Sequence, residues 1–177
     1  MKNRNFFIAL TLLFSFSACQ NTTKQENVAS LELEKPLDNV ILKDYGPEPL
    51  VLNIDDYTLS NTNFRTTLWT GANLQVTLMS IPVNGEVGLE LHNDLDQFLR
   101  IEEGVAEVFM GDTENELTYQ RKAEEDDAIF VPAGKWHNII NKGDKPLKLY
   151  SIYAPQEHPH GTIHIDKAAS DADEHHH

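Results

Sequence analysis

The sequence predicts an all-β fold, a sandwich or jelly roll of about eight to ten strands in a single domain. Short β-rich segments recur between residues 65 and 164, turn residues separate them at close intervals, and no amphipathic helical pattern interrupts them. The length of 177 residues fits one domain, and a hydrophobic fraction of 40% is enough for one core. No internal repeat is present, which indicates one barrel rather than a tandem pair.

The expected strands follow one another along the chain. A short helical turn is expected first, over residues 55–59. The strands then cover residues 74–81, 87–91, 97–101, 105–110, 117–119, 128–131, 137–140 and 147–153. Residues 74–81 alternate roughly between apolar and polar, which is typical of a strand with one buried face. Glycine, asparagine and aspartate between these segments favour tight turns.

The first 18 residues are predicted to be a signal peptide. A basic start with Lys2 and Arg4 precedes a largely apolar run over residues 6–16 and two small residues, the layout of a secretory signal. Cys19 follows at once, and this placement resembles a bacterial lipoprotein signal, in which the cysteine carries the lipid. It implies an exported protein anchored to the cell envelope, periplasmic or at the outer membrane, through lipidated Cys19. An ordinary cleaved signal and an uncleaved anchor are the alternatives.

Polar segments flank the predicted domain, which spans residues 48–167. Residues 19–47 are expected to form a flexible tether, part of which could dock as a short arm, and residues 168–177 a disordered tail. The tail ends in three histidines, for which a metal-binding role is not expected. Cys19 is the only cysteine, so an internal disulfide is impossible.

The net charge of the chain limits the classes of molecule that it is expected to bind. The formal net charge is −14, and such a surface repels phosphate backbones and anionic lipid headgroups. Nucleic acid is therefore not expected as a partner. No apolar run reaches the roughly 20 residues that span a bilayer.

Four polar side chains are expected to meet inside the barrel. Glu90 and His92 lie two residues apart in a strand and so share a face. Gln97 opens the next strand, and His137 follows a rigid turn on a later one. A carboxylate buried without a partner costs several kcal/mol, and a divalent cation would supply that partner.

These ligand types suit a divalent transition metal, with Mn, Fe, Ni and Zn all compatible. Two histidines and one carboxylate leave positions open for a further ligand. Each residue also has a plain structural interpretation: His137 as a core histidine, Glu90 as an exposed strand residue, Gln97 as a polar strand start. Taken together, these interpretations require four coincidences, so the sequence favours a metal site.

The second half of this constellation resembles a motif of the cupin superfamily. That motif has proline and glycine separated by one residue, a histidine three residues later and an asparagine four beyond it. Pro132, Gly134, His137 and Asn141 match it residue by residue. The resemblance implies a jelly-roll barrel, also called a double-stranded β-helix, with His137 as a metal ligand.

The first half resembles the other cupin motif with two departures. His92 matches its second histidine and Gly104 its closing glycine, whereas Glu90 stands in place of the first histidine and Gln97 in place of the glutamate. One carboxylate is thus kept but moved to position 90. The resemblance implies a metal set of Glu90, His92, Gln97 and His137.

The similarity extends over residues 53–167 and looks closer to small single-domain bacterial cupins, often labelled mannose-6-phosphate isomerase-like. Its motifs are specific for fold and weak for reaction. His158, His160 and His164 follow the last strand, near the expected mouth of the barrel. They could cover the site or supply an acid or base, and exposed loop histidines are an equally good interpretation.

Two function classes remain open. The first is a metal-dependent enzyme of the dioxygenase or isomerase type that acts on a small molecule. The second is a non-catalytic module of the cell envelope that binds a sugar or another small molecule. A homodimer is compatible with either class. No catalytic residue is assigned.

Overall fold

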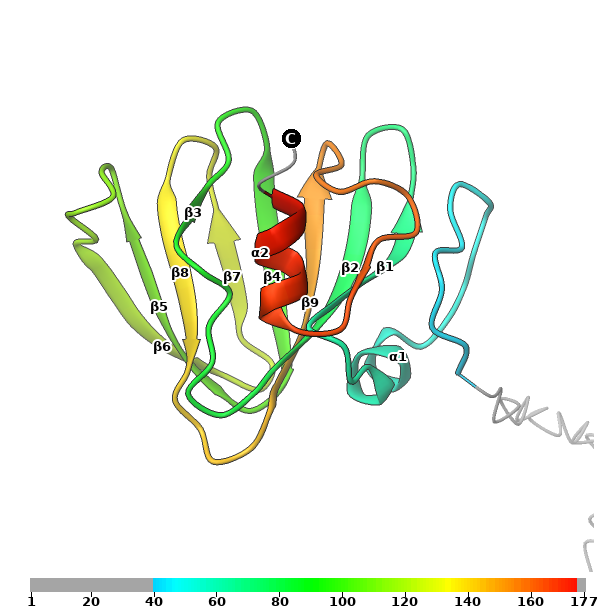
Figure 1. Cartoon of the computed structure of the whole chain (residues 1–177), viewed down its shortest axis with the longest axis horizontal. Helices are drawn as coiled ribbons and strands as arrows, with labels where there is room; N and C mark the ends of the chain where they lie inside the picture. The colour runs from blue at the N-terminus through cyan, green and yellow to red at the C-terminus, as the bar shows by residue number, and fades with distance from the viewer. Residues whose placement is uncertain (1–39, 175–177) are drawn as a thin grey trace, which may run out of the picture. The chain divides into compact units, whose positions relative to one another are not determined.

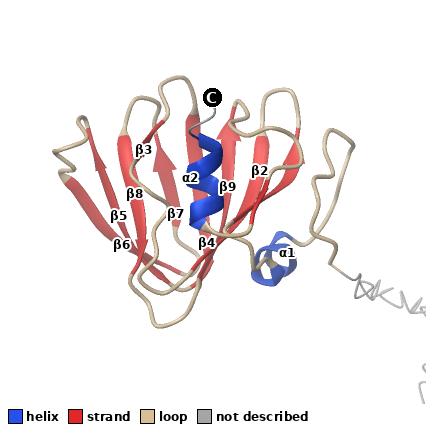
Figure 2. Cartoon of the chain, viewed as in Figure 1, coloured by secondary structure: helices blue, strands red, loops and turns tan. Residues whose placement is uncertain are grey.

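The computed structural model describes residues 40–174, which contain ten strands and two short helices (Figures 1 and 2). The predicted signal peptide, Cys19 and most of the predicted tether lie outside the described residues, as do the three terminal histidines. In chain order the elements are α1 (Ile54–Ser60), β1 (Arg65–Thr70), β2 (Gln75–Ile81), β3 (Glu90–Leu91), β4 (Asp96–Glu103), β5 (Val105–Gly111), β6 (Tyr119–Glu124), β7 (Ala128–Val131), β8 (Trp136–Asn141), β9 (Leu147–Ala154), β10 (Ile163–His164) and α2 (Lys167–Glu174).

The strands form two antiparallel sheets. One has the order β10-β1-β2-β9-β4-β7, and the other has the order β3-β8-β5-β6. Apart from the consecutive pairs β1-β2 and β5-β6, neighbouring strands are far apart in sequence, as in a jelly roll. The prediction of an all-β jelly-roll barrel is confirmed, and α1 covers the helical turn expected near residues 55–59.

The interior is apolar at one end of the barrel. Ile81 on β2 lies opposite Leu147 on β9, and Met79 lies opposite Leu149; all four side chains are fully buried. The turn between β4 and β5 closes tightly over this end through Gly104, whose φ is +105°. A Cβ there would lie 3.1 Å from the Cα of Leu147, so the position needs glycine.

One strand lies later in the chain than expected. The sequence predicts a strand over residues 117–119, whereas β6 spans Tyr119–Glu124. Ala123 is its only buried residue, because β6 is the edge strand beside β5. An exposed edge strand does not need apolar residues on alternate positions, so the hydrophobic pattern that locates buried strands is missing there.

The tether predicted over residues 19–47 extends too far toward the C-terminus, because its last residues belong to the folded domain. The backbone N–H of Tyr45 donates to the carbonyl of Leu68 on β1 (2.8 Å). The Asp44 carboxylate accepts from the backbone and hydroxyl of Thr70 and from the N–H of Gly161 (3.0, 2.6 and 3.1 Å). These bonds hold residues 44–46 against the barrel, where a tether had been predicted.

The prediction of a disordered tail from residue 168 is corrected by α2. Ser170 is buried and accepts a hydrogen bond from Nη1 of Arg65 on β1 (2.6 Å). Asp173 lies 3.1 Å from Nε2 of His164 on β10. Figure 1 shows α2 lying in front of β4 and β9. Tertiary contacts order this segment, although its composition is small and polar. No helix in the described part of the chain is long and apolar enough to cross a membrane.

Candidate metal centre

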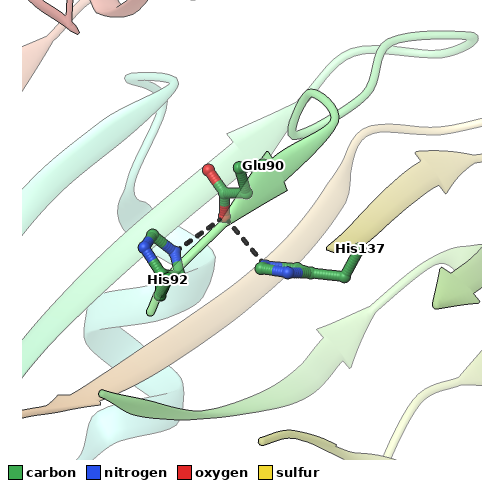
Figure 3. A group of neighbouring side chains, drawn as sticks. All are labelled: Glu90, His92 and His137. Carbon is green, nitrogen blue, oxygen red and sulfur yellow. Dashed lines mark hydrogen bonds and ion pairs between the residues drawn. The ribbon is translucent and has the colours of Figure 1, made fainter. Parts of the chain in front are cut away.

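Three of the predicted ligands meet between neighbouring strands. Glu90 on β3 lies directly opposite His137 on β8 in the antiparallel register. His92 follows β3 and lies on the same side as Glu90, as the two-residue spacing predicts. Figure 3 shows the carboxylate between the two imidazole rings.

The distances among these side chains fit a single metal ion. Oε1 of Glu90 lies 3.1 Å from Nε2 of His137 and 3.3 Å from Nε2 of His92. One donor atom from each residue lies within 4.8 Å of the others. Ligands bound to one metal at about 2.0–2.2 Å are separated by roughly 3 Å or more. The donor set of two imidazoles and one carboxylate also fits a first-row transition metal.

Both imidazoles are held so that Nε2 faces the carboxylate. Nδ1 of His137 lies 3.0 Å from the backbone carbonyl of Lys135. Nδ1 of His92 lies 3.4 Å from Oε1 of Glu157, which follows β9. Acceptors at Nδ1 fix the ring and leave Nε2 for a metal, the usual arrangement around metal-ligating histidines. Glu157 was not among the predicted site residues.

The charges of the three groups are strongly coupled. Burial alone would raise the pKa of Glu90, but hydrogen bonds and charge interactions with His137 and His92 outweigh it and hold the pKa well below its usual range. Burial alone would lower the pKa of His92, but Glu157 and Glu90 raise it to about 9. In the metal-free protein, the His92 cation therefore neutralises the Glu90 carboxylate. A bound cation would replace that proton.

The turn before β8 aligns His92 with His137. The N–H of Gly134 donates to the carbonyl of His92 (2.7 Å), and Gly134 has a φ of +77°, which favours glycine. The N–H of Ala133 donates to Oδ1 of Asp96 (2.9 Å), which ties the same turn to β4. The glycine of the second sequence motif therefore positions two ligands at once.

Gln97 lies on the facing sheet, apart from the group of three. It pairs with Tyr153 across β4 and β9, and the Tyr153 ring packs edge-on against His92 with 5.7 Å between centroids. Nε2 of Gln97 donates to Oγ of Ser151 (3.0 Å), and its buried Oε1 has no hydrogen-bond partner among the described residues. A buried amide oxygen without a hydrogen-bond partner is suited to bind the metal as a fourth ligand. That role of Gln97 stays a prediction.

Comparison with known proteins identifies the family. Residues 77–153 match the cupin domain family. The chain is 57% identical over 130 residues to YrkC, an uncharacterized protein of Bacillus subtilis. The aligned residues cover 73% of this chain and 70% of YrkC.

The chain belongs to the cupin superfamily. A crystal structure of BH2720 from Bacillus halodurans shares 56% identity and a TM-score of 0.73, over 73% of this chain and 98% of that one. An uncharacterized protein of Acanthamoeba polyphaga mimivirus, L612, is 39% identical over 124 residues, which cover 68% of this chain and 74% of L612. These relatives establish the family and assign no reaction.

A cavity of about 300 Å³ opens beside two of the three ligands of this cupin, Glu90 and His92. The segment after β9 and helix α2 provide its other walls. Its polar lining consists of three carboxylates and three imidazoles, from Glu90, Glu157, Asp173, His92, His158 and His164.

The three histidines after β9 have different surroundings. His158 and His164 line the cavity. His160 does not; its side chain is half exposed, and its Nε2 lies 3.0 Å from the carbonyl of Gly46. The expectation of histidines near the mouth of the barrel therefore describes two of the three.

Proposed function

We propose that this cupin binds one divalent transition metal through Glu90, His92 and His137, with Gln97 as a fourth ligand, and acts on a small molecule held beside the metal. The observation that carries the proposal is the convergence of two Nε2 atoms on one carboxylate oxygen, at 3.1 and 3.3 Å. Mn, Fe, Ni and Zn are all compatible with this donor set.

The supporting contacts favour a built site over a chance cluster. Each imidazole has an acceptor near Nδ1, from Lys135 or Glu157. Glu90 would otherwise be a largely buried carboxylate held only by two histidines. When bound, the metal supplies Lewis-acid or redox chemistry. The residues of the chain hold it and shape the cavity in which a small molecule is oriented.

Two substitutions test the ligand set. Glu90→Ala and His137→Ala are each expected to abolish stoichiometric metal binding, measured by elemental analysis after dialysis. His160→Ala and Glu114→Ala remove a histidine and a carboxylate outside the site, and both are expected to retain metal. Full metal content in the two site variants would contradict the proposal.

Gln97 needs a test of its own because it lies on the other sheet. Gln97→Leu removes the amide oxygen while keeping the size of the side chain approximately constant. We expect one metal per chain at saturation, with weaker affinity in competition with a chelator. Unchanged affinity would remove Gln97 from the ligand set.

Turnover separates an enzyme from a binding module. A neutral amide at position 97, where the cupin motif has a charged glutamate, favours the binding module as the second candidate. Oxygen uptake by the iron-loaded protein with catechols, flavonoids and sugar acids tests dioxygenation. A compound that raises the melting temperature and is recovered unchanged would support the binding role.

We further propose that the protein is exported and anchored at the cell envelope through lipidated Cys19. The support is the basic start, apolar run and small residues before that cysteine. The Cys19→Ser chain is expected in the soluble fraction after cell lysis. Unchanged membrane association would refute lipidation at Cys19.

A further inference from the structure

One wall of the cavity beside the metal ligands is fixed by a buried glutamine. The side chain of Gln75 on β2 is fully buried. Its Nε2 donates to the carbonyl of His158 (2.7 Å), and its Oε1 accepts from the N–H of His158 (2.9 Å). Both backbone groups of His158 are thereby satisfied by one amide. The segment after β9 is therefore held in place at the residue that faces the cavity.

The His158 ring is also confined. It packs edge-on against Tyr153, with 5.2 Å between centroids, and lies 6.5 Å from the ring of His164. Its Nε2 is buried and has no hydrogen-bond partner among the described residues. A buried polar atom without a partner destabilises the fold. His158 lines the cavity, so a ligand bound there would supply the missing partner.

The polar lining of this cavity favours a ligand that donates hydrogen bonds. Three carboxylates face it, and no lysine or arginine is among its lining residues in the described part of the chain. Arg65 is buried behind His164, where its Nη1 donates to Ser170 and lies 3.5 Å from Nδ1 of His164. Away from the metal, a phosphate or carboxylate on the ligand would meet Glu157 and Asp173 without a guanidinium or ammonium partner.

We propose that the cavity selects an uncharged hydroxylated ligand, one of whose hydroxyl groups hydrogen-bonds Nε2 of His158. This inference rests on the metal site proposed above, since the ligand would lie beside that metal. A hydroxyl group both donates and accepts, so it satisfies either tautomer of a neutral imidazole. Burial and the positive charge of Arg65 keep the ring neutral by lowering the pKa of His158 to about 3.

Two probes that differ by one charge test this inference. Catechol carries two neighbouring hydroxyl groups and no charge, and 3,4-dihydroxybenzoate adds only a carboxylate. Binding of each is measured by calorimetry on the zinc-loaded protein, because zinc does not oxidise either probe. We expect 3,4-dihydroxybenzoate to bind roughly tenfold more weakly than catechol. Equal or tighter binding of the acid would overturn the inference.

Substitution of His158 tests the contact itself. His158→Phe keeps a ring and removes Nε2, and catechol should bind roughly tenfold more weakly. His158→Gln restores a polar group and should recover part of that loss. His160→Phe, two residues away and outside the cavity, is the matched control and should bind catechol like the wild type. Wild-type affinity in His158→Phe would overturn the contact.

The zinc content separates the two proposals. If each chain holds one zinc and catechol does not bind, the ligand inference fails and the metal site stands. If the folded protein does not hold zinc or another transition metal, the metal site fails and this inference fails with it. Melting temperatures of all variants confirm that loss of binding is not loss of fold.

Discussion

The two ends of the barrel interior are buried equally and built from opposite chemistry. Along the β2–β9 pair, Ile81–Leu147 and Met79–Leu149 form the apolar end, and the next inward pairs are Thr77–Ser151 and Gln75–Tyr153. All eight side chains are fully buried. The second group of four lies toward His92, which contacts the Tyr153 ring. Along β2 and β9, a step of two residues, from Met79–Leu149 to Thr77–Ser151, thus leads from the apolar core to the polar end near the candidate metal site.

The polar end leaves several of its buried polar atoms without a hydrogen-bond partner among the described residues. Buried atoms without a hydrogen-bond partner among the described residues include Thr77 Oγ1, Gln97 Oε1, Tyr153 Oη and His158 Nε2. The apolar end has no such requirement, because its side chains carry no polar atoms. Proteins retain unsatisfied buried groups mainly where function requires them. The apolar end therefore stabilises the fold, whereas the polar end has the unsatisfied groups that the proposed binding role requires.

The largest expected effect comes from the apolar end. Leu149→Ala removes a fully buried side chain opposite Met79 and Ile101. A cavity of this kind lowers the free energy of unfolding by about 2–5 kcal/mol. Chemical denaturation of the metal-free variant measures the loss, and one metal per chain should still bind below the melting temperature. Loss of metal from a folded Leu149→Ala variant would break the separation of the two ends.

The next effect is at Glu157, which contacts Nδ1 of His92. Glu157→Ala is expected to weaken metal affinity by about 10–100-fold, the usual result of removing a group that orients a ligating histidine. Glu157→Gln keeps an acceptor oxygen and should lose less. The exposed Glu114 gives the control substitution Glu114→Ala, measured in the same chelator competition. Equal affinities in all three variants would show that Glu157 does not orient His92.

The pH dependence sharpens the comparison further. The pKa of His92 is raised to about 9 in the folded, metal-free protein, from about 6.5 in an unfolded chain. Its contribution to stability is fully present below pH of about 6.5 and is lost as the pH rises through 9. Metal affinity should change in the opposite direction and increase between these values, because binding displaces the proton.

Denaturation and metal titration across that pH range check both trends. His92→Gln is the control, because it removes the titrating ring and should flatten the metal-free stability profile over the same interval. A wild-type profile that is equally flat would contradict the proposed charge pairing of His92 with Glu90 and Glu157.

The smallest expected effect is at Thr77. Thr77→Val replaces an unpaired buried hydroxyl by a methyl group of similar shape. We expect the unfolding free energy to stay constant or to rise by about 1 kcal/mol. Denaturation measures this change. A loss comparable to that of Leu149→Ala would mean that the polar end is also built for stability.

The sequence predicts the parts of this molecule that depend on local spacing. Strand alternation places Glu90 and His92 on one face, and the turn around Gly134 brings His137 to them. The contact between Glu157 and His92 could not be predicted, because it joins segments whose proximity depends on the whole barrel. The helix α2 was missed for the same reason: Ser170 and Asp173 find their partners on β1 and β10.

The proposed function depends on a single transition metal bound between β3 and β8. Elemental analysis of a chain ending at Glu174, purified without chelator, tests it directly and excludes the three terminal histidines. We expect about one Mn, Fe, Ni or Zn ion per chain, lost in Glu90→Ala and retained in His160→Ala. A folded wild-type protein that contains no metal and does not rebind any of the four would contradict it.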